Sequence, residues 1–135
     1  YYSDLTVTVS AGEPGKKARE IYQIVRDAQK LAISAIQPGK KAREIDKKAR
    51  DYIKRKGYAR YFGHGLGHGL GLAVHEEPGI NSKSETELKP GMAFTIEPGI
   101  YLPAKFGVRI EDDIIIEHNK ARILSHSNQP LVILE

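Results

Sequence analysis

Three histidines stand among alternating glycines between Gly63 and Glu76, where they could bind a metal ion. Neutral imidazole is the commonest nitrogen ligand of zinc and related ions. Each glycine inside a helix costs about 1 kcal/mol relative to alanine, so this segment is predicted to be extended or looped. Glycines there also let a ligand or another backbone approach closely. The candidate residues are His64, His68 and His75; a flexible polar loop is the alternative interpretation.

Two glutamates further along the chain, Glu97 and Glu111, could supply oxygen ligands. They lie in stretches 94–97 and 108–116, which are rich in β-branched residues and are predicted to be strands. Residues 98–107 between them contain two prolines and two glycines and are predicted to be a connection.

The two predicted strands can pair as an antiparallel hairpin that is symmetric about Ala104, which places Glu97 opposite Glu111. The neighbouring pairs in this register are Thr95 with Asp113 and Ile96 with Asp112. Like charges that face each other across two strands destabilise a sheet, because their Cβ atoms are only about 4.5–5.5 Å apart. A bound cation would relieve this repulsion, and so would neutralisation by Arg109. An incidental glutamate pair on a solvated hairpin is the alternative.

The alternation of side chains along a strand assigns the residues of this hairpin to two faces. The polar face is predicted to carry Thr95, Glu97, Arg109, Glu111 and Asp113. The apolar face is predicted to carry Phe94, Ile96, Val108, Ile110 and Ile114.

The rest of the chain is predicted to form an α+β fold. Residues 1–10 alternate between apolar and polar types, which predicts a half-buried strand with Asp4 on its polar face. A helix is predicted from Lys16 to Ile36, where an apolar stripe recurs every three to four residues and Pro38-Gly39 follows. A second helix is predicted from Ala42 and ends at Gly57. The remaining predictions are a loop at 76–82, a turn at 118–121 and a strand at 131–134.

Composition limits the class of protein. A chain of 135 residues without cysteine fits one domain with no disulfide framework and no thiolate metal site, so a metal would need His, Asp and Glu ligands. No apolar run is long enough to cross a bilayer and no segment is typical of a signal peptide. A cytoplasmic location is therefore expected.

The net charge of +4 is unevenly distributed. Residues 16–60 contain fifteen Lys or Arg against five Asp or Glu, and the remainder contains six against twelve. The basic half could bind nucleic acid, but its lysines follow the polar sides of amphipathic helices without interleaved aromatic residues, which favours a solvated helix surface. Cations would collect near the acidic half.

Several motifs occur in order along nearly the whole chain. They are Ser3-Asp4-Leu5-Thr6, Gly67-His68-Gly69-Leu70-Gly71, Val74-His75-Glu76-Glu77-Pro78, Gly91-Met92-Ala93-Phe94-Thr95-Ile96-Glu97-Pro98-Gly99-Ile100-Tyr101 and Gly107-Val108-Arg109-Ile110-Glu111-Asp112. Together they resemble the motifs of the Xaa-Pro dipeptidase and aminopeptidase P family. These are prolidase-like metallopeptidases with the pita-bread fold, and relatives of methionine aminopeptidase. The resemblance implies a partial pita-bread fold, with a curved antiparallel sheet and two packed helices, and assigns residues 1–135 to the C-terminal portion of the catalytic domain.

The resemblance also implies a metal site and catalytic roles. Its metal ligands would be Asp4, His68, Glu97 and Glu111. The site would hold two divalent ions, with Mn²⁺ or Co²⁺ preferred and Zn²⁺ as another option. Glu97 would also shuttle a proton, His64 and His75 would contact the substrate and stabilise the tetrahedral intermediate, and Arg109 would orient the acidic cluster and bind substrate.

This chain departs from the family's pattern in two places. The family's other aspartate ligand lies on a strand before Asp4, which is absent here, and Val7 stands between two threonines where the family usually has arginine. Incomplete ligation is expected to weaken metal binding, so activity of the chain alone is left open.

The expected function is metal-dependent hydrolysis of Xaa-Pro peptide bonds. The expected partner is a peptide with proline at its second position, with no nucleic-acid or membrane partner, and a homodimer is left open. The alternative is a pita-bread module that binds peptides or proteins without cleaving them.

Overall fold

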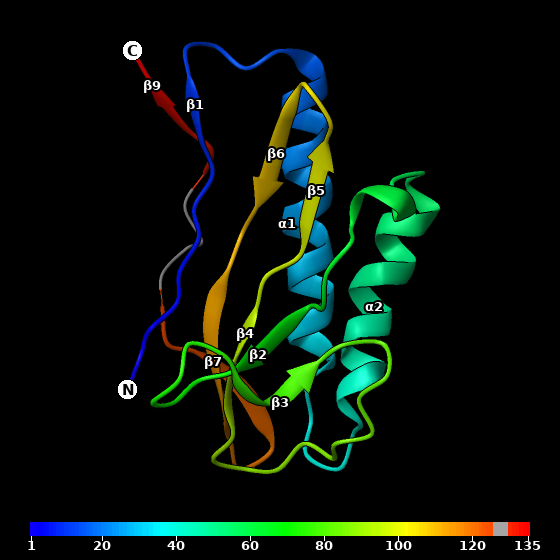
Figure 1. Ribbon diagram of the computed structural model, residues 1–135, viewed down its shortest axis with the longest axis vertical. Helices are drawn as coiled ribbons and strands as arrows, with labels where there is room; N and C mark the ends of the chain where they lie inside the picture. Colours follow the sequence, from blue (N-terminus) through cyan, green and yellow to red (C-terminus); the bar gives the residue numbers. More distant parts are fainter. Residues whose placement is uncertain (126–129) are drawn as a thin grey trace.

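Two packed helices and three small sheets make up the part of the chain that the computed structural model describes, residues 1–125 and 130–135 (Figure 1). The α-helices are α1 (Lys16–Ala35) and α2 (Ala42–Arg55), followed by a short 3₁₀ helix, η1 (Ala59–Tyr61). The strands are β1 (Val9–Ala11), β2 (Gly67–Gly69), β3 (Glu76–Ile80), β4 (Ala93–Ile96), β5 (Gly99–Leu102), β6 (Phe106–Arg109), β7 (Asp112–Glu117), β8 (Lys120–Ile123) and β9 (Val132–Leu134). No helix in these described ranges is both long and apolar enough to cross a membrane.

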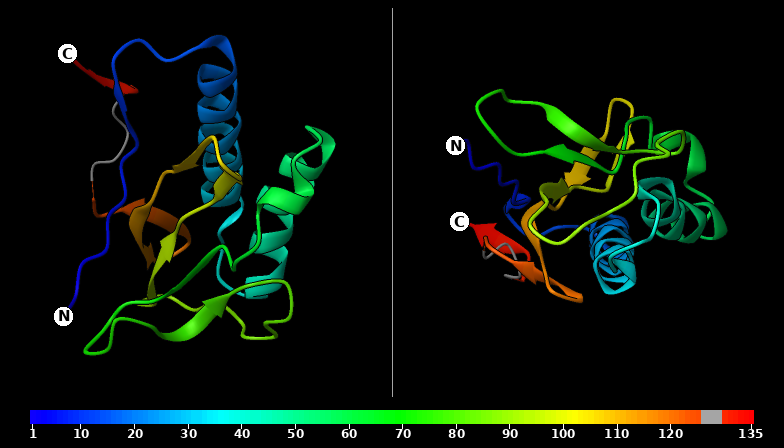
Figure 2. Two further views of the ribbon diagram at one scale, coloured as in Figure 1. Left: turned by 45° about the horizontal axis from the view of Figure 1, so that its top comes forward. Right: turned by 90° about the horizontal axis from the view of Figure 1, so that it is seen from below.

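The helices form as the sequence predicts and pack against one another beside the sheets (Figure 2). On the apolar stripe of α1, Ile21, Val25 and Ala28 are fully buried, and burial of one large aliphatic side chain stabilises the fold by about 1.5–3 kcal/mol. Gly57 follows α2 with a φ of 86°, a left-handed conformation that glycine adopts at low cost. Other residues of the predicted stripe are less buried: Leu31 is 41% exposed, and Ala18 and Ala35 are partly exposed.

The central hairpin has the predicted register. In the β4–β7 pair Thr95 lies opposite Asp113 and Ile96 opposite Asp112, and in the β5–β6 pair Gly99 lies opposite Arg109. Continuing this register places position 97 opposite position 111. The predicted apolar face is buried throughout, and α1 contacts β4, β5 and β6. The opposite face of the hairpin is therefore left for the polar residues.

The prediction that residues 98–107 form a connection is wrong. Gly99–Leu102 and Phe106–Arg109 pair as β5 and β6, so the turn is limited to residues 103–105, with Ala104 at a φ of 57°. Its prolines and glycines are tolerated because Pro98 lies just outside β5, Pro103 lies in the turn, and both glycines belong to a narrow two-stranded ribbon.

Two other strands lie where a loop and a turn were predicted. Glu76–Ile80 forms β3 at the edge of the sheet with order β3-β2-β4-β7-β8, where a proline without an N–H group is tolerated. Lys120–Ile123 forms β8, which pairs with β7 across a tight turn at His118 and Asn119. The predicted final strand exists as β9 and pairs in parallel with β1.

The first ten residues alternate as predicted, but their burial is reversed. Leu5, Val7 and Val9 are about half exposed, at 51%, 52% and 48%. Asp4 and Thr6 are the more buried residues, because they face the hairpin and bond to it. Only Val9–Ala11 is a regular strand in this part of the described chain.

Gly67 is required where β2 crosses β4, because a Cβ atom added there would lie 1.8 Å from the Thr95 carbonyl oxygen. We expect Gly67→Ala to lower the free energy of unfolding by about 2 kcal/mol or more, measured by urea denaturation. Gly63→Ala is the matched control, since nothing lies within 4 Å of its added Cβ. Equal stability of the two variants would contradict this account.

Candidate metal centre

Four chain segments lie side by side and bring the candidate ligands together. Outside the regular β4–β7 ladder, the Glu97 N–H donates to the Leu66 carbonyl at 2.8 Å, which joins the hairpin to the His/Gly segment. The Glu111 N–H donates to the Thr6 carbonyl at 3.0 Å, which joins the hairpin to the N-terminal segment. Each glutamate is thus held by a segment outside the hairpin. His68 lies on the segment that holds Glu97, and Asp4 lies on the segment that holds Glu111.

The side chains of Asp4, His68, Glu97 and Glu111 converge. His68 Nε2 lies 3.5 Å from Asp4 Oδ2 and 3.4 Å from Glu97 Oε1. Among the described residues, Asp4, His68 and Glu111 each offer one ligand atom, and these three atoms lie within 4.8 Å of one another. Glu97 contacts His68 but lies outside that tight group of three. The arrangement is three carboxylates around one imidazole ring.

The orientation of the His68 ring suits a metal ligand. Its Nδ1 lies 3.1 Å from the Gly69 carbonyl oxygen, which can only accept, so Nδ1 carries a proton in this hydrogen bond. In the neutral ring the Nε2 lone pair then points at the carboxylates of Asp4 and Glu97. This lone pair and the carboxylate oxygens can together donate to a cation. The hydrogen bond from Nδ1 to the Gly69 carbonyl fixes the orientation of the ring, as a second hydrogen bond does for histidine ligands in known metal sites.

Hydrogen bonds to Thr95 and Asp113 hold the backbone of His68 and Asp4 and the side chain of Glu97. Thr95 Oγ1 accepts from the His68 N–H at 3.1 Å and donates to Glu97 Oε1 at 3.1 Å. The Asp113 carboxylate accepts from Ser3 Oγ at 2.7 Å and from the Asp4 N–H at 3.3 Å. Both supporting residues are buried. They are the Thr95–Asp113 pair of the predicted register, so their place on this face was predicted and their supporting role was not.

Glu111 is the most perturbed acid of the cluster. Burial raises its pKa to about 7 from an ordinary value of 4.5, and the negative charges of Glu97 and Asp4 act in the same direction. The hydrogen bond from Thr6 and the charge of Arg109 oppose this rise without cancelling it. Without a cation, Glu111 therefore keeps its proton at mildly acidic pH and ionises only near neutral pH.

Arg109 and Tyr101 form a second polar group beside the cluster. Burial alone would lower the pKa of Arg109, but its hydrogen bond with Tyr101 and the charges of Glu111 and Glu97 raise it overall. Arg109 Nε also donates to Thr6 Oγ1 at 3.0 Å. Arg109 thus remains charged and partly offsets the negative charge of the two glutamates.

His64 lies in this second group and not among the metal-ligand candidates. Its Nδ1 lies 2.7 Å from the Gly65 carbonyl oxygen, which leaves Nε2 to accept from the Tyr101 hydroxyl at 3.0 Å. Arg50 of α2 donates to the His64 carbonyl at 2.8 Å and forms an ion pair with the fully buried Asp46 at 2.8 Å. A role for Tyr101 was not predicted from the sequence, although this residue is part of the Glu-Pro-Gly-Ile-Tyr motif.

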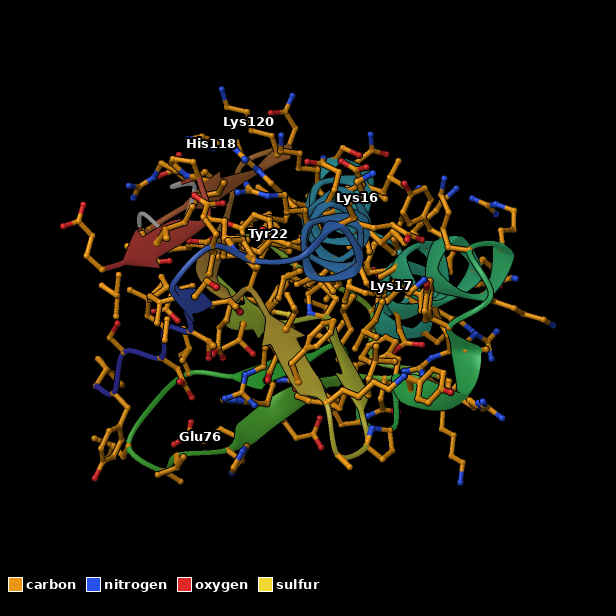
Figure 3. All side chains as sticks on the ribbon, turned by 90° about the horizontal axis from the view of Figure 1, so that it is seen from above. Lys16, Lys17, Tyr22, Glu76, His118 and Lys120 are labelled. Atoms are coloured by element: carbon orange, nitrogen blue, oxygen red, sulfur yellow. The ribbon has the colours of Figure 1, made fainter. Side chains whose placement is uncertain are left out.

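His75 lies across the β2–β3 loop from His68, with ring centroids 4.4 Å apart. The two residues are seven apart in sequence, and the structure brings them together because the β2–β3 register shifts between Gly67 and Gly69 and residues 70–75 form a loop. The carboxylate of Glu76, labelled in Figure 3, accepts from the Ala73 N–H at 2.7 Å and shapes this loop. The His75 side chain is exposed, so a ligand can reach it.

The donor set fits hard divalent ions. Carboxylate oxygens with a single imidazole suit ions such as Mn²⁺, and the close spacing of Asp4, His68 and Glu111 lets one ion reach all three. The fold and this cluster together define the class: an α+β protein with a candidate site for a divalent metal ion.

Residues 1–118 match the family model described as metallopeptidase family M24, so the chain belongs to this family. It is 52% identical over 132 residues to the Xaa-Pro dipeptidase of Pyrococcus furiosus. The matched residues cover 98% of this chain and 38% of that relative. It is also 52% identical over 134 residues to the uncharacterized peptidase YqhT of Bacillus subtilis, covering 99% of this chain and 38% of that relative.

Solved structures of related enzymes share the fold. An Xaa-Pro dipeptidase from Bacillus anthracis superposes with a TM-score of 0.94 at 51% identity, covering 98% of this chain and 37% of that one. An X-Pro aminopeptidase from Thermotoga maritima superposes with a TM-score of 0.94 at 40% identity, covering 98% of this chain and 37% of that one. The predicted prolidase-like resemblance and the partial α+β pita-bread fold are thereby confirmed. The chain spans about 38% of the length of the curated relatives it matches.

Proposed function

We propose that this chain contributes the metal centre of a peptidase that hydrolyses Xaa-Pro peptide bonds. The observation that carries the proposal is the convergence of Asp4, Glu97 and Glu111 on the imidazole of His68. The names of the relatives support the substrate class, since those from Pyrococcus and Bacillus anthracis are Xaa-Pro dipeptidases.

Two divalent ions, Mn²⁺ or Co²⁺ in preference to Zn²⁺, would be held by Asp4, His68, Glu97 and Glu111. Such ions act as Lewis acids that lower the pKa of water and polarise the scissile carbonyl. The Arg109 guanidinium offsets part of the negative charge of the cluster before an ion binds.

Glu97 is the residue best placed to move a proton. Its carboxylate is partly buried, and Thr95 donates to one of its oxygens at 3.1 Å, which fixes its orientation. We assign it to accept the proton of the attacking water and to deliver it to the leaving amine of proline. A positioned acid–base group of this kind typically contributes 10²–10⁴-fold in rate.

His64, His75 and Arg109 would contact the substrate. His75 is exposed beside His68, and His64 and Arg109 both bond to Tyr101, so the three residues border the acidic cluster from two sides. We assign the histidines to hydrogen bonds with the substrate backbone and with the tetrahedral intermediate. Arg109 is assigned to a substrate carboxylate or carbonyl.

The remaining expectations on partners stay predictions. Lysines of the basic half form ion pairs with helix neighbours, such as Lys17 with Glu20 at 3.2 Å, and Figure 3 shows Lys16 and Lys17 on the first turn of α1. This fits a solvated surface, which salt-dependent binding to DNA or RNA would contradict. A cytoplasmic location, a homodimer and the assignment of residues 1–135 to the C-terminal portion of the catalytic domain also stay predictions.

The experiment that tests the proposed function is a Mn²⁺ titration with Xaa-Pro hydrolysis as the readout. It uses both the 135-residue chain and the full-length gene product. We expect metal-dependent cleavage of a Met-Pro dipeptide by the full-length product and no cleavage of Met-Ala. Absence of any Mn²⁺-dependent cleavage would overturn the proposal. Binding of Xaa-Pro peptides without cleavage would favour the alternative, a non-catalytic peptide-binding module.

The Tyr101 hydroxyl should matter for substrate binding if His64 and Arg109 act as proposed. We expect Tyr101→Phe to lower kcat/KM for Met-Pro about tenfold, mainly through KM, because both partners lose the group that orients them. Tyr52→Phe is the matched control, since its hydroxyl donates from α2 to Asp27 of α1 at 3.1 Å, away from the cluster. An equal effect of both variants would contradict a role for Tyr101 at the site.

A further inference from the structure

Gln29 is a buried polar residue on the face of α1 that packs against the hairpin, and only 5% of it is exposed. Its side-chain Nε2 lies 3.3 Å from the Ile96 carbonyl oxygen and 3.4 Å from the Ile110 carbonyl oxygen. The same nitrogen lies 3.0 Å from Asp112 Oδ2. Ile96 precedes Glu97, Ile110 precedes Glu111 and Asp112 follows it, so one amide group contacts the backbone of both segments that carry the glutamates.

Gln29 contacts the hairpin between its two regular ladders, where few hydrogen bonds join the two strands directly. The regular ladder runs up to the Ile96–Asp112 pair and resumes at the Gly99–Arg109 pair. Between them, the Ile110 N–H donates to the Pro98 carbonyl over a long 3.5 Å. The amides of Glu97 and Glu111 are directed outward, to Leu66 and Thr6. The separation of the two glutamates therefore depends on contacts from outside the hairpin.

An uncharged donor is the side chain that suits this position. The N–H groups of Gln29 can be shared among three oxygen acceptors, and a buried amide carries no charge that would need a counterion. A methionine has nearly the same length without any donor, and a glutamate would present an oxygen to two carbonyls and a carboxylate.

We propose that Gln29 is a positioning residue of the metal centre, which sets the separation of Glu97 and Glu111 from behind the sheet. It acts through the carbonyls of the residues before them and through the Asp112 carboxylate. This inference rests on the proposed function for its metal readout and on the fold alone for its backbone readout. Residues that orient metal ligands from outside the ligand set typically change metal affinity 10–100-fold when removed.

The test compares four chains: wild type, Gln29→Met, Val25→Ala and Gln23→Met. Val25 is fully buried on the same helix, so its truncation destabilises α1 packing without touching the hairpin carbonyls that bind Gln29. Gln23 is an exposed glutamine on α1 that donates to Asp27 at 2.8 Å, and it controls for the glutamine-to-methionine change itself.

Hydrogen exchange of backbone amides, followed by NMR without metal, gives the first readout. In Gln29→Met we expect the Glu97 and Glu111 amides to lose at least tenfold more protection than amides at the centre of α2. In Val25→Ala we expect all these amides to lose protection equally. If Gln29→Met shows the same uniform loss as Val25→Ala, Gln29 has only a structural role and the proposal is overturned.

Mn²⁺ affinity measured by calorimetry gives the second readout. We expect Gln29→Met to bind about tenfold more weakly than wild type, while Val25→Ala and Gln23→Met bind as wild type does. Unchanged affinity in Gln29→Met would overturn the proposal. If the wild-type chain binds no Mn²⁺, the proposal that this chain holds a metal centre is overturned. Hydrogen exchange alone then decides whether Gln29 positions the two glutamate segments.

Discussion

Replacing Glu97 with glutamine is expected to lower kcat for Xaa-Pro hydrolysis by about 10³-fold in the full-length product. Glutamine keeps the size of the side chain and can still accept from Thr95, but it can neither take up a proton nor contribute negative charge to the site. Removing one ligand charge should also weaken Mn²⁺ binding. Assays at saturating Mn²⁺ separate the two effects, because the loss of affinity disappears there and the loss of proton transfer does not.

The matched control for Glu97→Gln is Glu117→Gln at the far end of the same hairpin. Glu117 pairs with Arg122 of β8 at 2.6 Å, outside the acidic cluster. Its variant should keep wild-type rates and wild-type Mn²⁺ affinity. If Glu97→Gln retains more than about a tenth of the wild-type kcat, then Glu97 is not the acid–base residue and a different group must move the proton.

The face of the hairpin that carries the site could be predicted because side-chain alternation and a symmetric turn leave little freedom. Once Ala104 is taken as the centre, Thr95 must lie opposite Asp113, which is their arrangement in the β4–β7 pair. The apolar face is buried against α1, and a slip by one residue would bury Glu97 and Glu111 there instead. The strong hydrophobic pattern of these two strands therefore determines their register.

The buried face of the N-terminal segment could not be predicted in the same way, because it depends on contacts with residues far away in the sequence. Its alternation is correct, but Leu5 and Val7 face outward and Thr6 faces the hairpin. Burial usually follows apolar side chains. Here the Thr6 hydroxyl donates to the Glu111 carboxylate and the Asp4 carboxylate lies beside His68, and these long-range contacts determine which face turns inward.

Residues that support the site from a distance were the hardest to find from sequence. Gln29 lies in an ordinary amphipathic helix, and nothing in its neighbours marks it apart from its place on the buried face. Its acceptors, including Asp112, are more than 60 residues away in the chain. Strand β3 was missed for a related reason: Pro78 and Gly79 disfavour a strand locally, and pairing with β2 at the sheet edge overrides that preference.

Stability of the metal-free chain is expected to fall as the pH rises from about 4.5 to about 7, because of Glu111. In the folded chain its pKa is about 7, above the ordinary value of 4.5. Below pH 4.5 the group is protonated in both states, so its contribution does not change with pH there. Between the two values the unfolded chain releases this proton while the folded chain retains it, so rising pH favours unfolding. The raised pKa corresponds to a contribution of about 3 kcal/mol to the free energy of unfolding, and this contribution is fully lost above pH 7.

Urea denaturation at several pH values, with Glu111→Gln as the control, isolates this effect. The glutamine cannot titrate, so the variant should lack this loss of stability and become more stable than wild type near pH 7. Saturating Mn²⁺ should reverse the trend for wild type only, because a bound cation favours the ionised carboxylate and its binding then releases a proton. Parallel pH profiles of the two metal-free chains would show that Glu111 is already ionised in the fold. The buried, closely packed carboxylates would then have to be stabilised by Arg109 and hydrogen bonds alone.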